Sequence, residues 1–262
     1  MAAQTLPITA VDAPRAGPVG QRVRAVRRLV AMLAKTAWHG SRAAWRARSG
    51  ERLRADEVTG QWARSVIRAL GVRPVVHGSF PSEATVVVAN HRSYLDIPLL
   101  AAARPTVFLA KAEIAGWPLI GRAAEAAGTV FVRRGDKASQ TQAAASLQRL
   151  AQQGRVVTVF PEGTTTAGPA MEPLRPGMFR IAASTQVAVA PVAIVYPRRA
   201  DAYCGNDRFL PHFLRAFTER RVRPHISFGR ALRSDDPALL HATAERWLQR
   251  ELARLEDLVR PA

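Results

Sequence analysis

Short apolar runs alternate with longer segments of helical periodicity from residue 72 to the end of the chain. The runs are rich in valine and end at polar residues, glycine or proline, which favours buried strands over helices. This alternation predicts an α/β fold with a mostly parallel sheet flanked by helices. Strands are predicted near residues 72–77, 86–89, 106–110, 129–132, 156–160, 187–195 and 222–228. Helices are predicted near residues 96–103, 117–127, 137–153, 176–185, 208–218 and 237–259.

The first 71 residues follow a different pattern. Residues 1–20 combine prolines and glycines without periodicity, which predicts a disordered leader. Residues 22–48 carry eight basic side chains and no acidic one, and a second helix is predicted over residues 51–70. We therefore expect an N-terminal helical preface over residues 21–71, followed by one domain over residues 72–262. The apolar residues of the first helix recur at three- and four-residue steps, which is helical spacing: Val23, Val26, Val30, Leu33 and Ala37.

A basic amphipathic helix that also carries Trp38 and Trp45 suits the plane of a membrane interface. Its apolar face would enter the lipid, and each basic side chain near an anionic surface contributes about 1 kcal/mol. We therefore expect residues 21–71 to be a membrane-association segment, with the protein peripheral at the cytoplasmic face of the cell membrane. The alternative is a helix packed on the domain with an arginine-rich solvent face, and basic amphipathic helices also bind other partners.

The charge balance points to a polyanionic partner. The chain has 38 Lys and Arg against 20 Asp and Glu, a net charge of +18, which suits either an anionic membrane or nucleic acid. No helix-turn-helix, RRM or zinc pattern supports nucleic acid as a partner, so a basic binding module without catalysis is only the alternative of a different class. A single cysteine, Cys204, excludes an internal disulfide.

No membrane span or signal peptide is expected. The longest charge-free run, residues 181–197, has 17 residues and contains polar side chains and a proline, whereas a span needs about 20 predominantly apolar residues. The amino terminus has no basic region leading into an apolar one, which a signal peptide requires.

The first cluster of candidate chemistry is NHRSYLD, residues 90–96, directly after an apolar run. On a regular helix His91 and Asp96 would point about 140° apart, so they meet only if His91 lies in the loop after the strand and Asp96 begins the next helix. Pro98 fits that arrangement, because proline is tolerated in a first helical turn. An aspartate bonded to one imidazole nitrogen leaves the other free as a general base. The alternative is a packed histidine and a helix-capping aspartate, which short patterns also produce.

A second cluster, FPEGTTT, spans residues 160–166 and also follows an apolar run. Gly163 lets the backbone approach a ligand, Thr164 adds a hydroxyl donor, and Glu162 can orient a ligand hydroxyl or a neighbouring arginine. A surface turn is the alternative. Because the carboxyl ends of parallel strands meet at one edge of a sheet, we expect this cluster to share a site with His91.

A third cluster, GTVFVRRGD, ends a predicted strand with Arg133 and Arg134. Adjacent strand residues point to opposite faces, so only one of the two arginines is expected to enter the site unless the strand has already ended. Guanidinium groups suit phosphate, which they bind through two parallel hydrogen bonds. The alternative is a solvated pair of arginines at a strand end.

These motifs resemble those of the glycerolipid acyltransferases, of the 1-acylglycerol-3-phosphate acyltransferase type. NHRSYLD resembles the family's NHx4D signature, FPEGTTT its FPEGT motif, GTVFVRRGD the block between them, and VAPVAIV the apolar block that follows, over roughly residues 75–230. The resemblance implies an O-acyltransferase of phospholipid biosynthesis that moves a fatty acyl group to a lysophospholipid hydroxyl, with 1-acylglycerol-3-phosphate as the first candidate acceptor. It also implies acyl-CoA or acyl carrier protein as co-substrate, no cofactor and no metal.

Residue roles follow from the resemblance. His91 would be the base and Asp96 the group that stabilises the imidazolium. The chain departs from the family's commonest form, FPEGTRS, at Thr165, where one phosphate contact is missing. This leaves room for a lyso-ornithine lipid or another lysolipid as acceptor, with Arg175 or Arg180 as candidates for a substitute charge. The expected substrate-binding residues are Asn90, Arg134, Glu162, Gly163 and Thr164.

A hydrolase is a further alternative, with Ser93 as nucleophile beside His91. However, the residues around Ser93 lack the GxSxG turn that exposes such a serine.

Overall fold

The computed structural model describes residues 17–49 and 52–260. Within these residues one seven-stranded sheet has the order β1-β7-β6-β2-β5-β3-β4. Its neighbouring strands are parallel except β6 and β7, which are antiparallel. This confirms the predicted α/β fold with a mostly parallel sheet. The strands are β1 (Val75–His77), β2 (Ala84–Ala89), β3 (Val107–Lys111), β4 (Val130–Val132), β5 (Val157–Val159), β6 (Ala188–Val195) and β7 (His225–Phe228).

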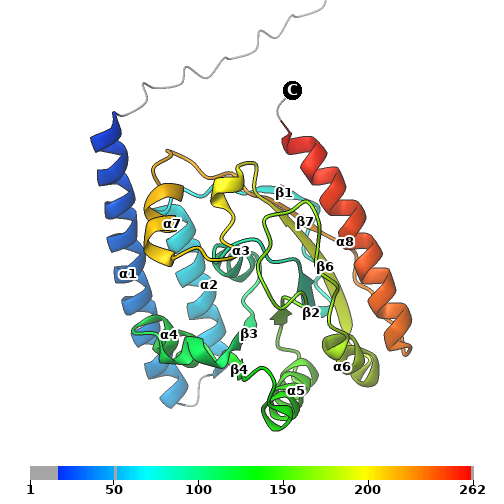
Figure 1. The fold of residues 1–262 in the computed structure, drawn as a ribbon. Helices are drawn as coiled ribbons and strands as arrows, with labels where there is room; N and C mark the ends of the chain where they lie inside the picture. Colours follow the sequence, from blue (N-terminus) through cyan, green and yellow to red (C-terminus); the bar gives the residue numbers. More distant parts are fainter. Residues whose placement is uncertain (1–16, 50–51, 261–262) are drawn as a thin grey trace, which may run out of the picture.

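Helices cover both faces of the sheet (Figure 1). The helices α1, α2, α3 and α7 share one apolar core, and α5, α6 and α8 share the other. Successive residues of β2 point into different cores, Val87 into the first and Val88 into the second, as strand geometry requires. The α-helices are α1 (Pro18–Arg48), α2 (Arg52–Ala69), α3 (Asp96–Ala103), α4 (Ile120–Ala126), α5 (Lys137–Gln152), α6 (Gly177–Thr185), α7 (Phe209–Ala216) and α8 (Pro237–Val259). Two 3-10 helices are η1 (Ala112–Gly116) and η2 (Arg199–Asp201).

Two segments differ from the predicted elements. The helix expected near residues 117–127 begins only at Ile120, because Pro118 and Leu119, whose φ is 63°, separate it from η1. At the amino terminus α1 already begins at Pro18, a residue type that suits a first helical turn. Residues 18–20 are therefore helical rather than part of a leader, Gly17 precedes the helix, and residues 1–16 of the expected leader lie outside the described residues.

The first helix is integrated into the fold. It packs against α2, α4 and α7. Arg28 is buried and donates to the carbonyl oxygens of Phe217, Glu219 and Arg220 just after α7, and Arg24 donates to that of Thr218. Cationic side chains stabilise the free carbonyl groups at a helix end in this way.

This burial has two consequences. Burial, together with the neighbouring charge of Arg24, lowers the pKa of Arg28 to about 10. Gly71 lies so close to the Arg28 guanidinium that a Cβ there would clash with it. Two of the eight basic residues that we expected to face lipid, Arg24 and Arg28, instead hold α7 in place.

Candidate active site

His91 lies in the loop after β2, and α3 begins at Asp96, which is the arrangement that the residue spacing predicts. The two side chains meet: His91 Nδ1 is 2.8 Å from Asp96 Oδ2. The His91 side chain is 19% exposed, and its Nε2 has no partner within the part of the chain that the structure describes. A neutral imidazole held in this way donates from Nδ1 to the carboxylate and keeps Nε2 as the basic nitrogen.

The Asp96 carboxylate is fully buried and has donors for both of its oxygens. Oδ2 also accepts the backbone N–H groups of Arg92 at 2.7 Å and Ser93 at 2.9 Å. Oδ1 accepts the hydroxyl of Tyr196 at 2.7 Å. The sequence offered no signal for Tyr196, because it follows the apolar run of β6, 100 residues from Asp96, and belongs to no motif.

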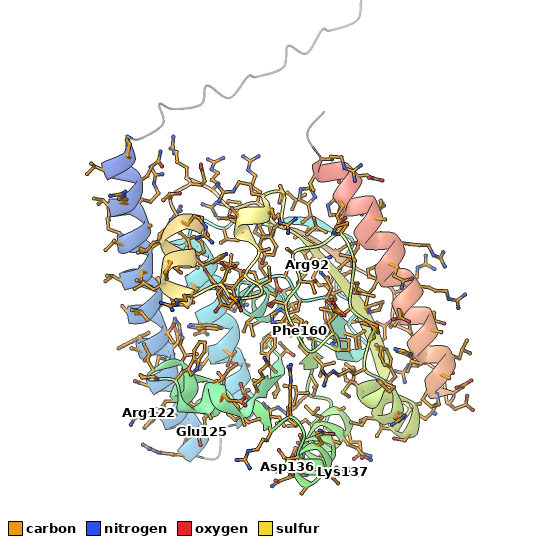
Figure 2. The ribbon with its side chains drawn as sticks, viewed as in Figure 1. Arg92, Arg122, Glu125, Asp136, Lys137 and Phe160 are labelled. Atoms are coloured by element: carbon orange, nitrogen blue, oxygen red, sulfur yellow. The ribbon has the colours of Figure 1, made fainter. Side chains whose placement is uncertain are left out.

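The His91 ring is also held from the side of the FPEGTTT loop. It stacks on Phe160 with ring centroids 3.9 Å apart and an interplanar angle of 14°, and Phe160 in turn stacks on Phe108. The backbone N–H of Thr166 donates to the His91 carbonyl at 2.9 Å. The two clusters therefore lie together at the carboxyl ends of β2 and β5, which are neighbours in the sheet. Figure 2 labels Phe160 and Arg92, one residue from each cluster, near the centre of the view.

Asn90 and Glu162 do not present their polar atoms to a ligand. The Asn90 amide pairs with the backbone of Ile194 on β6, donating at 2.9 Å and accepting at 2.7 Å. Glu162 is 4% exposed, and its carboxylate accepts the backbone N–H groups of His91 at 2.8 Å and Glu172 at 3.0 Å. Burial raises the pKa of the Glu162 carboxyl, and these backbone bonds oppose that shift. Both residues were expected to bind substrate, which stays a prediction; in this structure their polar atoms bond the backbone of Ile194, His91 and Glu172.

Arg92 ties the same two loops together. Its buried guanidinium donates to the hydroxyl of Thr166 and to the carbonyl oxygens of Pro169 and Ala170, and it lies 3.6 Å from the Glu256 carboxylate of α8. An arginine so placed fixes the chain that follows the FPEGTTT motif. Both terminal nitrogens of the guanidinium are thus directed to groups of the protein itself.

Ser93 is not placed to act as a nucleophile. Its side chain is completely buried, and its hydroxyl has no hydrogen-bond partner among the described residues. A nucleophilic serine must reach both its base and the substrate carbonyl. The buried hydroxyl argues against the hydrolase alternative.

A cationic edge borders the FPEGTTT loop. Arg133 turns to Asp136 at the start of α5, with 3.6 Å between the charged atoms. Arg134, in contrast, has its pKa lowered by partial burial and by the charge of Arg175. Arg175 lies over Gly163, where a Cβ would be 2.9 Å from the arginine Nε, and Gly163 has a φ of 72°. Neither Arg134 nor Arg175 has a hydrogen-bonded or ionic side-chain partner within residues 17–49 and 52–260.

Thr164 and Thr165 follow Gly163 in the same loop. Thr164 is exposed beside Gly163, and Thr165 is partly buried. Arg180 is exposed on α6. Among the described residues no three His, Cys, Asp or Glu side chains come together as metal ligands.

Comparisons with known proteins identify the family of the chain. A protein-family model described as "Acyltransferase" matches residues 72–195. The chain is 41% identical over 179 residues to the lyso-ornithine lipid O-acyltransferase of Pseudomonas aeruginosa. The aligned region covers 65% of this chain and 68% of the relative. It is 33% identical over 135 residues to the 1-acyl-sn-glycerol-3-phosphate acyltransferase of Neisseria meningitidis, covering 51% and 53%.

A solved structure has the same fold. The crystal structure of the 1-acyl-sn-glycerophosphate acyltransferase PlsC from Thermotoga maritima matches with a TM-score of 0.71 over 91% of this chain and 97% of that one, at 20% identity. The chain belongs to the glycerolipid acyltransferase family, which confirms the resemblance of the motifs. It is a lysolipid O-acyltransferase, which uses an acyl donor and a lysolipid acceptor.

The first prediction concerns His91. If His91 is the general base, as we predict, His91→Ala should lower acyl transfer by about 10²- to 10⁴-fold, the usual contribution of a positioned general base. Folding should be preserved, because Asp96 keeps its other three donors. Transfer of labelled acyl groups and thermal melting measure the two properties. His77→Ala, on the outer strand β1, is the matched control, and a His91→Ala enzyme that kept more than a tenth of its activity would contradict the assignment.

Proposed function

We propose that this chain is a lyso-ornithine lipid O-acyltransferase rather than an enzyme for 1-acylglycerol-3-phosphate, the acceptor that the motifs alone place first. The observation that carries the proposal is the 41% identity to the Pseudomonas aeruginosa enzyme of that name. Thr165 supports it, because the missing arginine reduces the positive charge next to the acceptor. The donor is acyl-CoA or acyl carrier protein, both of which are anionic and suit a basic surface.

The reaction uses His91 as base. Its Nε2 takes the proton of the acceptor hydroxyl while the hydroxyl oxygen bonds to the thioester carbonyl carbon, and Asp96 stabilises the imidazolium that forms. The carbon–sulfur bond then breaks, and the leaving thiolate takes the proton back from His91. No covalent acyl-enzyme is required, because the thioester is already activated and the acceptor is held beside it.

The charges at the cationic edge fit a zwitterionic head group. A lipid whose ornithine is amide-linked through its α-amino group has one carboxylate and one ammonium group, whereas a phosphate monoester carries about −1.5 to −2 at neutral pH. One carboxylate needs a single guanidinium fork, which Arg134 or Arg175 can supply. Glu113, whose charge acts on Arg134, lies two residues beyond the end of β3, next to β4, and offers an anion for the ammonium.

Restoring the family's arginine should change the acceptor preference. Wild-type enzyme, given one labelled acyl-CoA, should prefer lyso-ornithine lipid to lysophosphatidate. Thr165→Arg should raise kcat/KM for lysophosphatidate. The ratio of kcat/KM for lyso-ornithine lipid to that for lysophosphatidate should fall by about tenfold, which corresponds to the binding free energy of one charge-assisted hydrogen bond. Thr141→Arg, on the exposed side of α5, adds the same charge away from the site and should leave the preference unchanged. An unchanged preference in Thr165→Arg would contradict the role of this position.

Arg175 should act on acceptor binding. Arg175→Ala should raise KM for the acceptor by about tenfold with little change in kcat, because a remote head-group contact is made equally in the ground state and the transition state. Steady-state kinetics with varied acceptor measure this. Arg180→Ala, another exposed arginine five residues along the chain on α6, is the matched control. Equal effects of the two substitutions would mean that Arg175 contributes only general positive charge.

We also propose that the exposed face of α1 docks on the membrane. That face carries an apolar stripe with two tryptophans beside it, while the opposite face, including Ala25, Thr36 and Ala43, packs on the protein. No helix among the described residues is long and apolar enough to span a bilayer. Apolar side chains in the lipid and the remaining basic residues at its phosphates would hold the protein at the interface. The exposed apolar residues of α1 are Val19, Val23, Val26, Val30, Leu33, Trp38 and Trp45.

Charges in this stripe should weaken membrane binding without affecting the fold. The double variant Val23→Asp, Val30→Asp removes apolar contact and adds repulsion from anionic lipid, so binding to anionic vesicles should fall by at least tenfold. Vesicle co-sedimentation measures binding, and turnover of a short-chain soluble acceptor should stay near that of wild type. The control is Leu239→Asp, Leu258→Asp on α8, two exposed leucines in the other helical layer. Equal binding by both double variants would rule out α1 as the docking face.

A further inference from the structure

The two oxygens of the Asp96 carboxylate are held in different ways. Oδ2 receives its donors from the loop to which Asp96 itself belongs: His91, Arg92 and Ser93. Oδ1 accepts from Tyr196, the residue directly after β6 and, within the described part of the chain, its only hydrogen-bond donor. The catalytic loop is thus tied to a distant strand through one hydroxyl group.

We infer that Tyr196 is a positioning residue of the reaction, which orients the Asp96 carboxylate toward His91 and shares its negative charge. The inference rests on the proposed acyl transfer with His91 as base. Tyr196 does not reach the substrate in this role. It acts through Asp96, in a buried chain of hydrogen bonds from Tyr196 to Asp96 to His91.

The surroundings fix Tyr196 in place. Its side chain is buried, and two residues earlier Ile194 is bonded on both its N–H and its carbonyl to Asn90, directly before His91 in the chain. The end of β6 and the start of the catalytic loop therefore cannot move independently. Burial, reinforced by the nearby Asp96 charge, raises the pKa of Tyr196 well above its ordinary value, so the hydroxyl remains protonated and acts as a donor.

Loss of this hydroxyl should affect both rate and pH dependence. Without Tyr196 one carboxylate oxygen is unpaired, and the carboxylate is held less rigidly on the imidazole, to which Oδ2 remains bonded. The negative charge of Asp96, no longer shared with the Tyr196 hydroxyl, also attracts a protonated imidazole more strongly. A general base must be neutral to accept a proton, so the acid side of the pH–rate profile should move to higher pH.

Other charged groups around the pair are unchanged in such a variant. Glu162, from the loop after β5, bonds the backbone of His91, and Arg92 lies near it. Asp201 of η2 and Tyr94 of the catalytic loop act on Tyr196 electrostatically. A shift of the pH–rate profile in this variant can therefore be ascribed to the loss of the Tyr196 hydroxyl.

The experiment compares Tyr196→Phe with Tyr94→Phe. Tyr94→Phe removes the same kind of group from a neighbouring position, where the hydroxyl lies 3.1 Å from His212 Nδ1 and does not touch Asp96. For Tyr196→Phe we expect kcat to fall by about tenfold, KM for the acceptor to change less than twofold, and the acid side of log kcat against pH to move up by about half a unit or more. Tyr94→Phe should keep the wild-type midpoint.

The outcomes separate the possible explanations. A Tyr196→Phe enzyme with wild-type rate and midpoint overturns the inference. So does a lower rate with an unmoved midpoint, because a smaller folded fraction scales the whole profile down without shifting it. A shift of equal size in Tyr94→Phe would also overturn it, by showing a general effect of buried hydroxyl groups. If wild-type enzyme acylates neither lyso-ornithine lipid nor lysophosphatidate, the proposed function fails instead.

Discussion

The active site depends on a single buried charge. A carboxylate removed from water is costly unless donors replace its hydration, and Asp96 has four such donors from its own loop and from the end of β6. Each bond fixes a different part of the site: the imidazole, two successive backbone N–H groups of the same loop, and the residue after a strand end. The same interactions that make the buried charge tolerable therefore also fix the direction in which His91 presents its free nitrogen. Stability and catalytic geometry have one physical origin here.

A second set of contacts supports the first from the FPEGTTT loop. Glu162 holds the His91 backbone, Phe160 holds the face of its ring, and Arg92 reaches back to the chain that follows the motif. Most of the polar atoms in both motifs are thus used within the protein. The groups that we propose to meet the substrate are the His91 Nε2 and the cationic edge formed by Arg134 and Arg175. Most residues of the two motifs therefore hold the site in position, and only a few are proposed to react with or bind the substrate.

The sequence predicted the elements well because their signals are local. The predicted bounds of α8 and α3 are those of the structure, and Asp136 caps α5 by accepting the Ser139 N–H. The His91–Asp96 contact was predictable for the same reason, since spacing and one proline determine it. The order of the sheet and the antiparallel pairing of β7 depend on contacts between distant segments, and no local pattern encodes them.

The residues that sequence reasoning missed or misplaced share that limitation. Tyr196 and Arg28 meet their partners across about 100 and 190 residues. Asn90 and Glu162 were identified as residues of the site, but residue type does not say where the polar atoms point. Arg175 was named only as a candidate for the missing charge, and its position over Gly163 is a property of the folded loop.

The contact between α1 and α7 bears on how a lipid enzyme couples its surface to its chemistry. Arg28 of α1 holds the end of α7, and α7 packs through His212, Phe209 and Phe213 on Tyr94 of the catalytic loop. Two packed contacts, between α1 and α7 and between α7 and Tyr94, therefore connect the helix proposed to dock on the membrane with the loop that carries His91. Removing the first 48 residues would abolish the Arg28 contact as well as the apolar stripe, so loss of activity in such a truncation cannot be ascribed to membrane binding alone. Substitutions confined to the exposed stripe separate the two effects, because none of those side chains supports α7.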